Sequence, residues 1–189
     1  LAKMERIDYR QSERTGQGSV MEGFWERWRR HYGDNGFVNA RGDRLLTELA
    51  LRALDELKPR LMMVNYQDPD YVHWGQAWHY TRAISIIDRS LRHLVAKVDA
   101  DPYYHNDTVF VVVPDCGRDD NRFTRLPFQH HFNSRSAREI WALFFGSGIP
   151  GGVVVDQVAD QISVAPTIGA LMGFETPLTE GAPLHQVFA

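Results

Sequence analysis

Residues 109–117 read Val-Phe-Val-Val-Val-Pro-Asp-Cys-Gly, and this stretch decides the fold class that the sequence predicts. A run of β-branched and aromatic residues stops abruptly at an acid, a thiol and a glycine. Buried parallel strands have such continuous apolar runs, and they place the residues that follow them at the rim of an α/β sheet. Asp115 is therefore a candidate site residue at the carboxyl end of a strand.

Two other polar clusters adjoin segments with strand or loop character. Residues 68–73 read Asp-Pro-Asp-Tyr-Val-His, and residues 129–131 read Gln-His-His. Carboxylates and imidazoles are common ligands of divalent metals in proteins. Three such clusters in one α/β domain predict a metal site built from loops at the ends of several strands.

The spacing of apolar residues alternates between the helical and the strand type along the chain. The predicted elements are helix 43–57, strand 61–66, helix 74–98, strand 108–113, strand 139–145 and helix 164–172. Residues 1–42 lack a sustained period, and we interpret them as a connecting or insertion region with a short aromatic helix near residues 21–31. The order of elements predicts an α/β fold for residues 43–189, with a mainly parallel sheet flanked by helices.

The composition is that of an ordinary globular chain. The 189 residues are 43% hydrophobic and 24% charged, with a formal net charge of -3, which fits one domain or a large part of one. Because no long basic run occurs, we expect no nucleic-acid polymer as a partner. No apolar run approaches the length of a membrane span. The single cysteine excludes an intrachain disulfide and leaves the redox compartment open.

Six segments, in their order along the chain, resemble the carboxy-terminal half of the alkaline phosphatase superfamily. This superfamily includes sulfatases, nucleotide pyrophosphatases/phosphodiesterases and cofactor-independent phosphoglycerate mutases. The segments are 68–75 (DPDYVHWG), the following helix with Tyr80 and Asp88, 111–119 (VVVPDCGRD), His130-His131, 140–149 (IWALFFGSGI) and 165–173 (APTIGALMG). The resemblance covers about residues 60–188. It implies a three-layer α/β sandwich that is incomplete in this chain, and a periplasmic or secreted location is compatible with it.

The resemblance also implies a two-metal hydrolase of phosphate or sulfate esters. Paired divalent ions neutralise the negative charge on the nonbridging oxygens of such esters. Zinc is favoured, with calcium, magnesium or manganese as alternatives. Arg118 would bind the same oxygens or pair with Asp119 or Asp120. The metal ligands that the resemblance implies are Asp70 or Asp68, His73, and His130 or His131 for one ion, and Asp115 for the other.

Two positions depart from the superfamily pattern. Cys116 follows Asp115 where the superfamily usually has a histidine, so its thiolate binds zinc or the position has lost its metal role. The loop aspartate usually lies four residues before its histidine, whereas Asp70 lies three and Asp68 five residues before His73. The sequence therefore leaves the choice between the two aspartates open.

Each candidate also has a purely structural interpretation. Residues 68–70 alone would more often form a helix-capping turn. The histidines at 130–131 alone would more often be a solvated loop pair, although we favour one ligand and one supporting residue. Cys116 is more often a buried inert thiol than a ligand, and Asp88 is more often a structural partner for an arginine or a backbone amide than a catalyst. Only the combination of clusters favours a metal site.

The nucleophile of the superfamily lies in an amino-terminal strand–loop–helix unit, and no segment before residue 60 resembles it. We therefore expect part of a sulfatase-like hydrolase of an anionic ester, with the nucleophile-bearing front half absent from this chain. The alternative is a non-catalytic metal-binding or interaction module that keeps the fold. Because the predicted strands are few for a parallel sheet, we expect the missing half, a partner chain or an oligomer to cover apolar faces.

Overall fold

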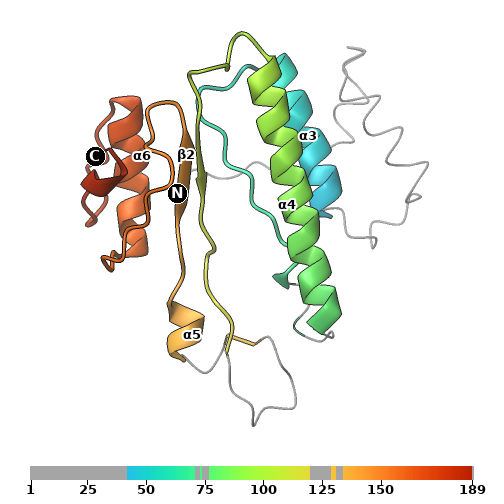
Figure 1. Cartoon of the computed structure of the whole chain (residues 1–189), viewed down its shortest axis with the longest axis vertical. Coiled ribbons are helices and arrows are strands. Elements are labelled where there is room, and N and C mark those ends of the chain that lie inside the picture. Colours follow the sequence, from blue (N-terminus) through green and yellow to red (C-terminus); the bar gives the residue numbers. More distant parts are fainter. Residues whose placement is uncertain (1–41, 71–72, 74–76, 120–128, 131–133, 189) are drawn as a thin grey trace, which may run out of the picture. The chain divides into compact units, whose positions relative to one another are not determined.

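The computed structural model describes residues 42–70, 73, 77–119, 129–130 and 134–188 (Figure 1). The chain divides into two compact units, Leu1–Lys97 and Val98–Ala189. The aromatic helix expected near residues 21–31, as well as Asp120 and His131, lies outside the described residues.

Two helices form the framework of the first unit. Helix α3 spans Asp43–Glu56, and helix α4 spans Ala77–Ala100 and reaches the boundary between the units. Both confirm helices that the apolar periodicity predicts. After α3, Lys58 takes a positive φ of 45°, and Pro59 follows it. Because a proline ring is incompatible with a preceding helical residue, the helix cannot continue past this point.

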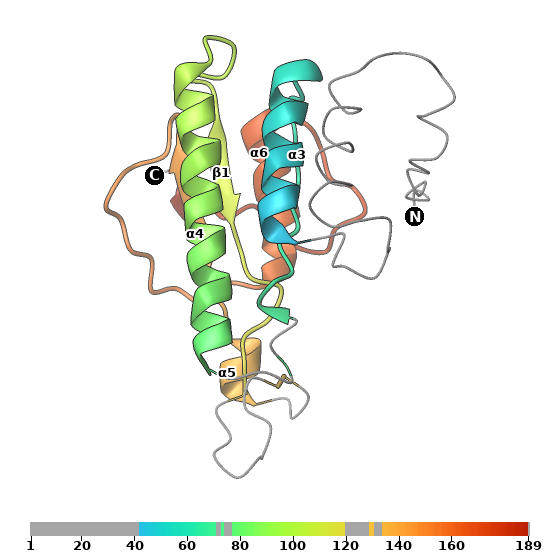
Figure 2. The same cartoon turned by 90° about the vertical axis from the view of Figure 1, so that its right-hand side faces the viewer.

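The helices α3 and α4 lie side by side in both views (Figures 1 and 2). Lys97 on α4 donates a charged hydrogen bond to the Asp55 carboxylate on α3. Each buried leucine of this framework contributes about 1.5–3 kcal/mol relative to an exposed one. The buried apolar side chains that these helices contribute to the first unit are Ala50, Leu54, Ala83 and Leu94.

The strand predicted over residues 61–66 is not present, and this prediction is wrong. The segment has no assigned strand, although exposed and half-buried residues alternate along it from Leu61 to Tyr66. A period of two is the pattern of an extended chain with one covered face. A strand also needs a hydrogen-bonded neighbour, and the sheet in the described part of the chain pairs only two other segments.

The second unit contains that two-stranded sheet. Strand β1, Val109–Val112, pairs antiparallel with strand β2, Leu143–Gly146. The rings of Phe110 and Phe145 face each other across the pair, with centroids 4.9 Å apart and planes 6° from parallel. The described strands thus form an antiparallel pair, and the mainly parallel sheet stays a prediction.

The two strand predictions of this unit differ in accuracy. The strand expected over residues 108–113 is confirmed as β1, whereas the one expected over 139–145 begins too early. A four-residue helix, α5 (Arg135–Arg138), comes first, and β2 starts only at Leu143. Ser134 begins this helix, because its hydroxyl accepts the Ala137 N–H at 3.2 Å.

Helix α6 spans Val164–Met172, as the sequence predicts, after a short 3₁₀ turn η2 at Gln161–Ser163. Gly173 ends it in the left-handed conformation, with φ 75° and ψ 32°, which glycine adopts without a steric penalty. The fully buried Thr167 on α6 accepts the Leu184 N–H at 2.8 Å. This bond ties the carboxy-terminal segment, with its 3₁₀ turn η3 at His185–Val187, to α6.

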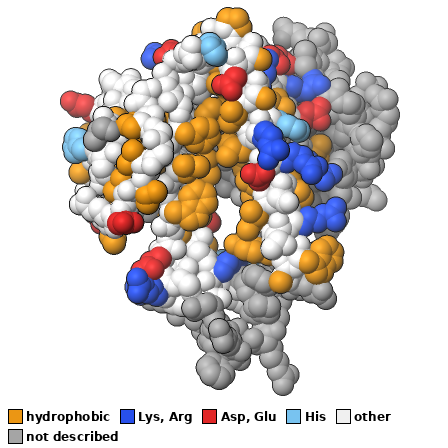
Figure 3. Space-filling view, in the orientation of Figure 1, with side chains coloured by type: hydrophobic (Ala, Val, Ile, Leu, Met, Phe, Trp, Pro, Cys, Tyr) orange, Lys and Arg blue, Asp and Glu red, His pale blue; other side chains and the backbone are white. Residues whose placement is uncertain are grey.

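Large apolar side chains are exposed on the face drawn in Figure 3 and elsewhere on the described surface. None of the described helices combines the length and apolar character needed to cross a membrane. The apolar surface is what a covering segment or partner chain would require, and that partner stays a prediction. The most exposed apolar side chains, between 84% and 99% exposed, are Met63, Val154, Val158 and Leu178.

Candidate functional site

Asp70 and His73 come together in the first unit, where the extended segment ends. The distance between Asp70 Oδ1 and His73 Nε2 is 3.0 Å. A turn helps to place Asp70, because its N–H donates to the Gln67 carbonyl at 2.9 Å. The His73 side chain is 15% exposed and that of Asp70 is 67% exposed. The imidazole is therefore largely covered, while the carboxylate faces solvent.

The donor atoms of this pair, a carboxylate oxygen and an imidazole nitrogen, are of types that bind divalent metals. In a tetrahedral zinc site with bonds of about 2.0–2.1 Å, two ligand atoms lie roughly 3.3 Å apart. The 3.0 Å between Asp70 Oδ1 and His73 Nε2 is a hydrogen-bond distance, so the two atoms would have to move slightly apart and exchange this bond for bonds to one ion. An imidazole with a carboxylate suits zinc better than calcium or magnesium, which prefer oxygen ligands.

Asp43, the first residue of α3, holds the loop that leads to this pair. It is fully buried, and its carboxylate accepts two backbone N–H groups, from Gln67 at 2.8 Å and from Asp68 at 2.9 Å. Burial raises the pKa of the Asp43 carboxyl; the two N–H groups partly offset the rise, and the charge of Asp68 adds to it. A buried side chain of α3 thus fixes two consecutive residues of the loop.

Asp68 makes the reciprocal contact. Its Oδ1 accepts the Asp43 N–H at 3.3 Å, which is one of the backbone donors that the first turn of a helix leaves without an intrahelical partner. A negative charge at this end of α3 is also favourable to the helix dipole. Asp68 therefore has a structural contact with α3, whereas Asp70 is the aspartate in contact with His73.

Thr47 and Tyr66 make a second polar contact between α3 and the segment that leads to the loop. The Thr47 hydroxyl donates to the Asp43 carbonyl at 2.6 Å and lies 3.1 Å from the Tyr66 hydroxyl. Burial raises the pKa of Tyr66, while hydrogen bonds with Thr47 and Ser90 lower it and the charge of Asp43 raises it. Tyr66 thus links the extended segment to both α3 and α4, since Thr47 belongs to α3 and Ser90 to α4.

In the second unit, Asp115 and Cys116 follow β1 as the sequence predicts. The Asp115 side chain is exposed, and its Oδ1 accepts the N–H of the adjacent Cys116 at 2.9 Å. The Gln161 amide donates to the carbonyls of Pro114 and Asp115, at 3.1 and 3.3 Å. Cys116 is half-buried and not disulfide-bonded. The main chain after β1 is therefore anchored, with the Asp115 carboxylate at the surface.

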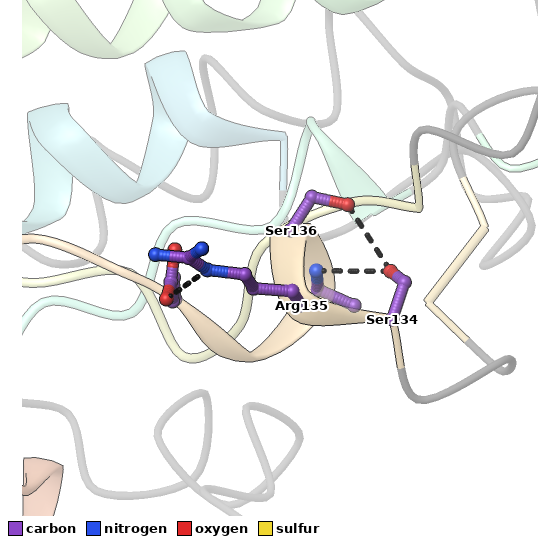
Figure 4. Close-up of polar contacts among 5 residues, drawn as sticks. Ser134, Arg135 and Ser136 are labelled. Atoms are coloured by element: carbon purple, nitrogen blue, oxygen red, sulfur yellow. Dashed lines mark hydrogen bonds and ion pairs between the residues drawn. The ribbon is translucent and has the colours of Figure 1, made fainter.

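Gly117 anchors the same loop to α5. Its N–H donates to the Ala137 carbonyl at 2.8 Å, and a Cβ at this position would lie 2.0 Å from the Ser136 carbonyl oxygen. Only a residue without a side chain allows this approach. Figure 4 shows the start of α5, where the Ser134 hydroxyl lies 3.1 Å from that of Ser136 and accepts the Ala137 N–H.

The remaining predicted residues of the second unit lie along this loop. Arg118 is half-buried, and Asp119 accepts a hydrogen bond from the Ser134 hydroxyl. The Asp119 N–H donates to the carbonyl of the buried Gln129 at 2.6 Å. This bond fixes the position in the chain immediately before the half-buried His130.

Two residues that organise these loops were missed by sequence reasoning. Asp43 looked only like an acid at a helix start, because its partners lie 24 and 25 residues away in the sequence. Ser134 precedes a helix of only four residues, too short to show periodicity. A polar residue followed three positions later by alanine is too common a pattern to have identified the cap.

Comparison with known proteins gives no relative for this chain: no family model, no curated protein and no solved structure matches it. The functional proposal therefore depends on the residues, their geometry and the resemblance of the six segments.

Proposed function

We propose that this chain is the carboxy-terminal part of a metal-dependent, sulfatase-like hydrolase of sulfate or phosphate esters. The observation that supports it most is the Asp70–His73 pair, whose two ligand atoms lie 3.0 Å apart at the edge of the first unit. Because the covered imidazole limits side-chain motion and the exposed carboxylate leaves access for a ligand, the pair suits an ion that must also meet a substrate.

The proposal assigns each residue a role. Asp70 and His73 bind one ion, for which the resemblance implies His130 or His131 as a further ligand, and Asp115 belongs to the second. When bound, zinc would stabilise negative charge on the ester oxygens. Arg118 supplies a planar pair of donors that suits the same oxygens. The nucleophile comes from a segment outside the six resembling ones, since none of them contains a match to it.

One observation favours the alternative, a metal-binding or interaction module without turnover. Cys116 replaces the histidine that the superfamily usually has, and the Asp115 carboxylate accepts the Cys116 N–H. Loss of the second ion would leave the Asp70–His73 site intact while removing the two-metal chemistry. Both proposals thus share the first metal site and differ in whether a bound anion is activated.

The shared site is tested by zinc content after dialysis. We expect His73→Ala to lower the zinc content of the chain, because it removes one of few ligands. His93→Ala, which changes an exposed histidine of α4, should leave the zinc content unchanged. Equal zinc in the wild type and in the His73→Ala variant would contradict the metal site in both proposals.

Anion binding separates the two proposals. For the hydrolase we expect the zinc-loaded chain to bind inorganic phosphate or sulfate in calorimetry, and Arg118→Gln to weaken this binding. The chain alone should not hydrolyse aryl phosphate or aryl sulfate above the metal-only background, because loss of a covalent nucleophile lowers rates by orders of magnitude. Zinc binding without any anion binding would favour the module.

A further inference from the structure

We infer that Asp43 is a positioning residue that orients the Asp70–His73 pair through the backbone of residues 67–70. The inference rests on the proposed metal site and deepens it, because it also assigns Asp68 a structural role and Asp70 the ligand role. Asp43 lies on α3, far from His73 in the sequence, and the described contacts connect them step by step.

The first step is the pair of hydrogen bonds by which the Asp43 carboxylate holds the backbone of the loop. Its two oxygens each accept one backbone N–H, from Gln67 at 2.8 Å and from Asp68 at 2.9 Å. Two bonds from a rigid, planar group fix the orientation of two consecutive peptide units. The carboxylate itself is fixed because Asp43 is fully buried at the start of α3.

In the second step, the orientation of the peptide units at residues 67 and 68 determines where the Asp70 carboxylate lies relative to His73. The carbonyl of Gln67 accepts the Asp70 N–H at 2.9 Å, so the residue held by Asp43 also closes the turn that contains Asp70. Asp70 Oδ1 then lies 3.0 Å from His73 Nε2. A rotation of the peptide units at 67–68 would therefore move the Asp70 carboxylate relative to the imidazole.

The reciprocal contact explains why the two aspartates differ. Asp68 Oδ1 accepts the Asp43 N–H at 3.3 Å, so its side chain turns toward the start of α3. Asp70 instead faces His73. The chain thus uses one aspartate of the Asp-Pro-Asp sequence to join the loop to α3 and leaves the other for the ion.

The experiment compares Asp43→Asn with Tyr66→Phe in the full chain. An asparagine keeps the shape of the side chain, but its amide nitrogen is a donor and cannot accept the second backbone N–H. Tyr66→Phe removes the neighbouring bond to Thr47 and leaves both bonds of Asp43 in place. Tyr66→Phe is therefore a control that weakens the contact between α3 and the loop but keeps the hydrogen bonds from residues 67 and 68 to Asp43.

Three measurements decide the inference. In the wild type, we expect the amides of Gln67 and Asp68 to exchange hydrogen as slowly as those inside α3. Fast exchange would mean that the two hydrogen bonds to Asp43 do not hold these amides, and it would contradict the inference. In Asp43→Asn, we expect the ¹⁵N resonances of the His73 ring to change in the metal-free chain. Zinc affinity should fall roughly 10-fold to 100-fold, as for other residues that support metal ligands. Tyr66→Phe should leave the ring resonances and the affinity unchanged.

The outcomes separate this inference from the proposed function. If the wild type binds no zinc but the His73 resonances change in Asp43→Asn, the metal site fails and the positioning role stands. If zinc binding depends on His73 but Asp43→Asn changes neither readout, the positioning role is overturned and the metal site stands. Should Asp43→Asn not fold, Asp43→Ser replaces it in the same measurements. Serine is favoured near helix starts, and it lacks the two carboxylate oxygens that accept the N–H groups of Gln67 and Asp68.

Discussion

The loop before His73 and the loop after β1 are both acidic loops, but they are held in place in different ways. In the first, a buried carboxylate of α3 binds the backbone of Gln67 and Asp68. In the second, the main-chain bonds Gly117–Ala137 and Asp119–Gln129 act together with side-chain bonds from Gln161 and Ser134. One loop is held by a single buried carboxylate, and the other is held by several bonds together with a close approach of main chains at Gly117.

This difference bears on which acid is ready to bind a metal. Asp70 has an imidazole as a neighbour, at 3.0 Å, whereas the Asp115 carboxylate accepts the N–H of the next residue in its own chain. Among the described residues, the position of Asp115 after an apolar strand thus does not place its carboxylate beside an imidazole. What distinguishes Asp70 is its side-chain contact with a second loop residue, His73.

The largest effect is expected where main chains approach most closely. Gly117→Ala would place a Cβ 2.0 Å from the Ser136 carbonyl oxygen, so the loop or α5 must shift. We expect a loss of about 3 kcal/mol in the stability of the second unit, near the upper end of typical overpacking costs. Hydrogen exchange of the β1 amides measures the stability of this unit, because β1 belongs to it.

A matched glycine provides the control. Gly151 has no atom near the position of a Cβ, and its backbone does not require a positive φ, so Gly151→Ala should leave the exchange of the β1 amides unchanged. If the two variants exchange alike, the backbone contact between Gly117 and α5 does not hold the loop. The comparison between the two loops would then be wrong.

A smaller effect is expected from Tyr66→Phe, which tests the side-chain join. The change leaves the buried hydroxyls of Thr47 and Ser90 without the Tyr66 hydroxyl, so we expect a loss of about 1–2 kcal/mol in urea unfolding near neutral pH. Tyr103→Phe, at an exposed tyrosine, should change stability much less.

The same variant has a defined pH dependence. Burial raises the native pKa of Tyr66 above its unfolded value of about 10. The stabilisation from the neutral hydroxyl is therefore complete below about pH 10 and is lost as the pH rises through the higher native pKa. The stability difference between wild type and Tyr66→Phe should shrink over that window. A difference that grows with pH would contradict a raised pKa.

Local patterns predicted the described helices α3, α4 and α6 well, because helical periodicity and stop signals lie within a few residues of each other. The end of α6 at Gly173 is one case, and the end of α3 before Pro59 is another. The strand expected over 61–66 failed for a physical reason, since an alternating pattern specifies an extended segment but cannot supply its hydrogen-bonded partner. The start of β2 failed similarly, because Leu143 pairs with Val112, the last residue of β1, and residues 139–142 lie beyond the paired part of that strand.

The candidate site was partly predictable for the same reason. Asp70 and His73 lie only three residues apart in the sequence, their side chains are in contact, and their residue types are visible in the sequence. The role of Asp68 was not predictable, because it depends on Asp43, 25 residues away. A sequence without an alignment carries no signal for such a pair.

The smallest effect is expected at an acid that resembles Asp43 only in being on a helix. Asp88 on α4 pairs with Arg92 at 3.2 Å, which agrees with one of the two predicted kinds of partner, an arginine or a backbone amide, and both side chains are mostly exposed. Such pairs contribute about 0.3–0.5 kcal/mol, so Asp88→Asn should lower the free energy of unfolding by no more than this. In 1 M salt the difference should vanish, because the screening length falls to about 3 Å. A salt-independent loss above about 1 kcal/mol would mean that Asp88 has a buried role, and the contrast between exposed and buried helix acids would fail.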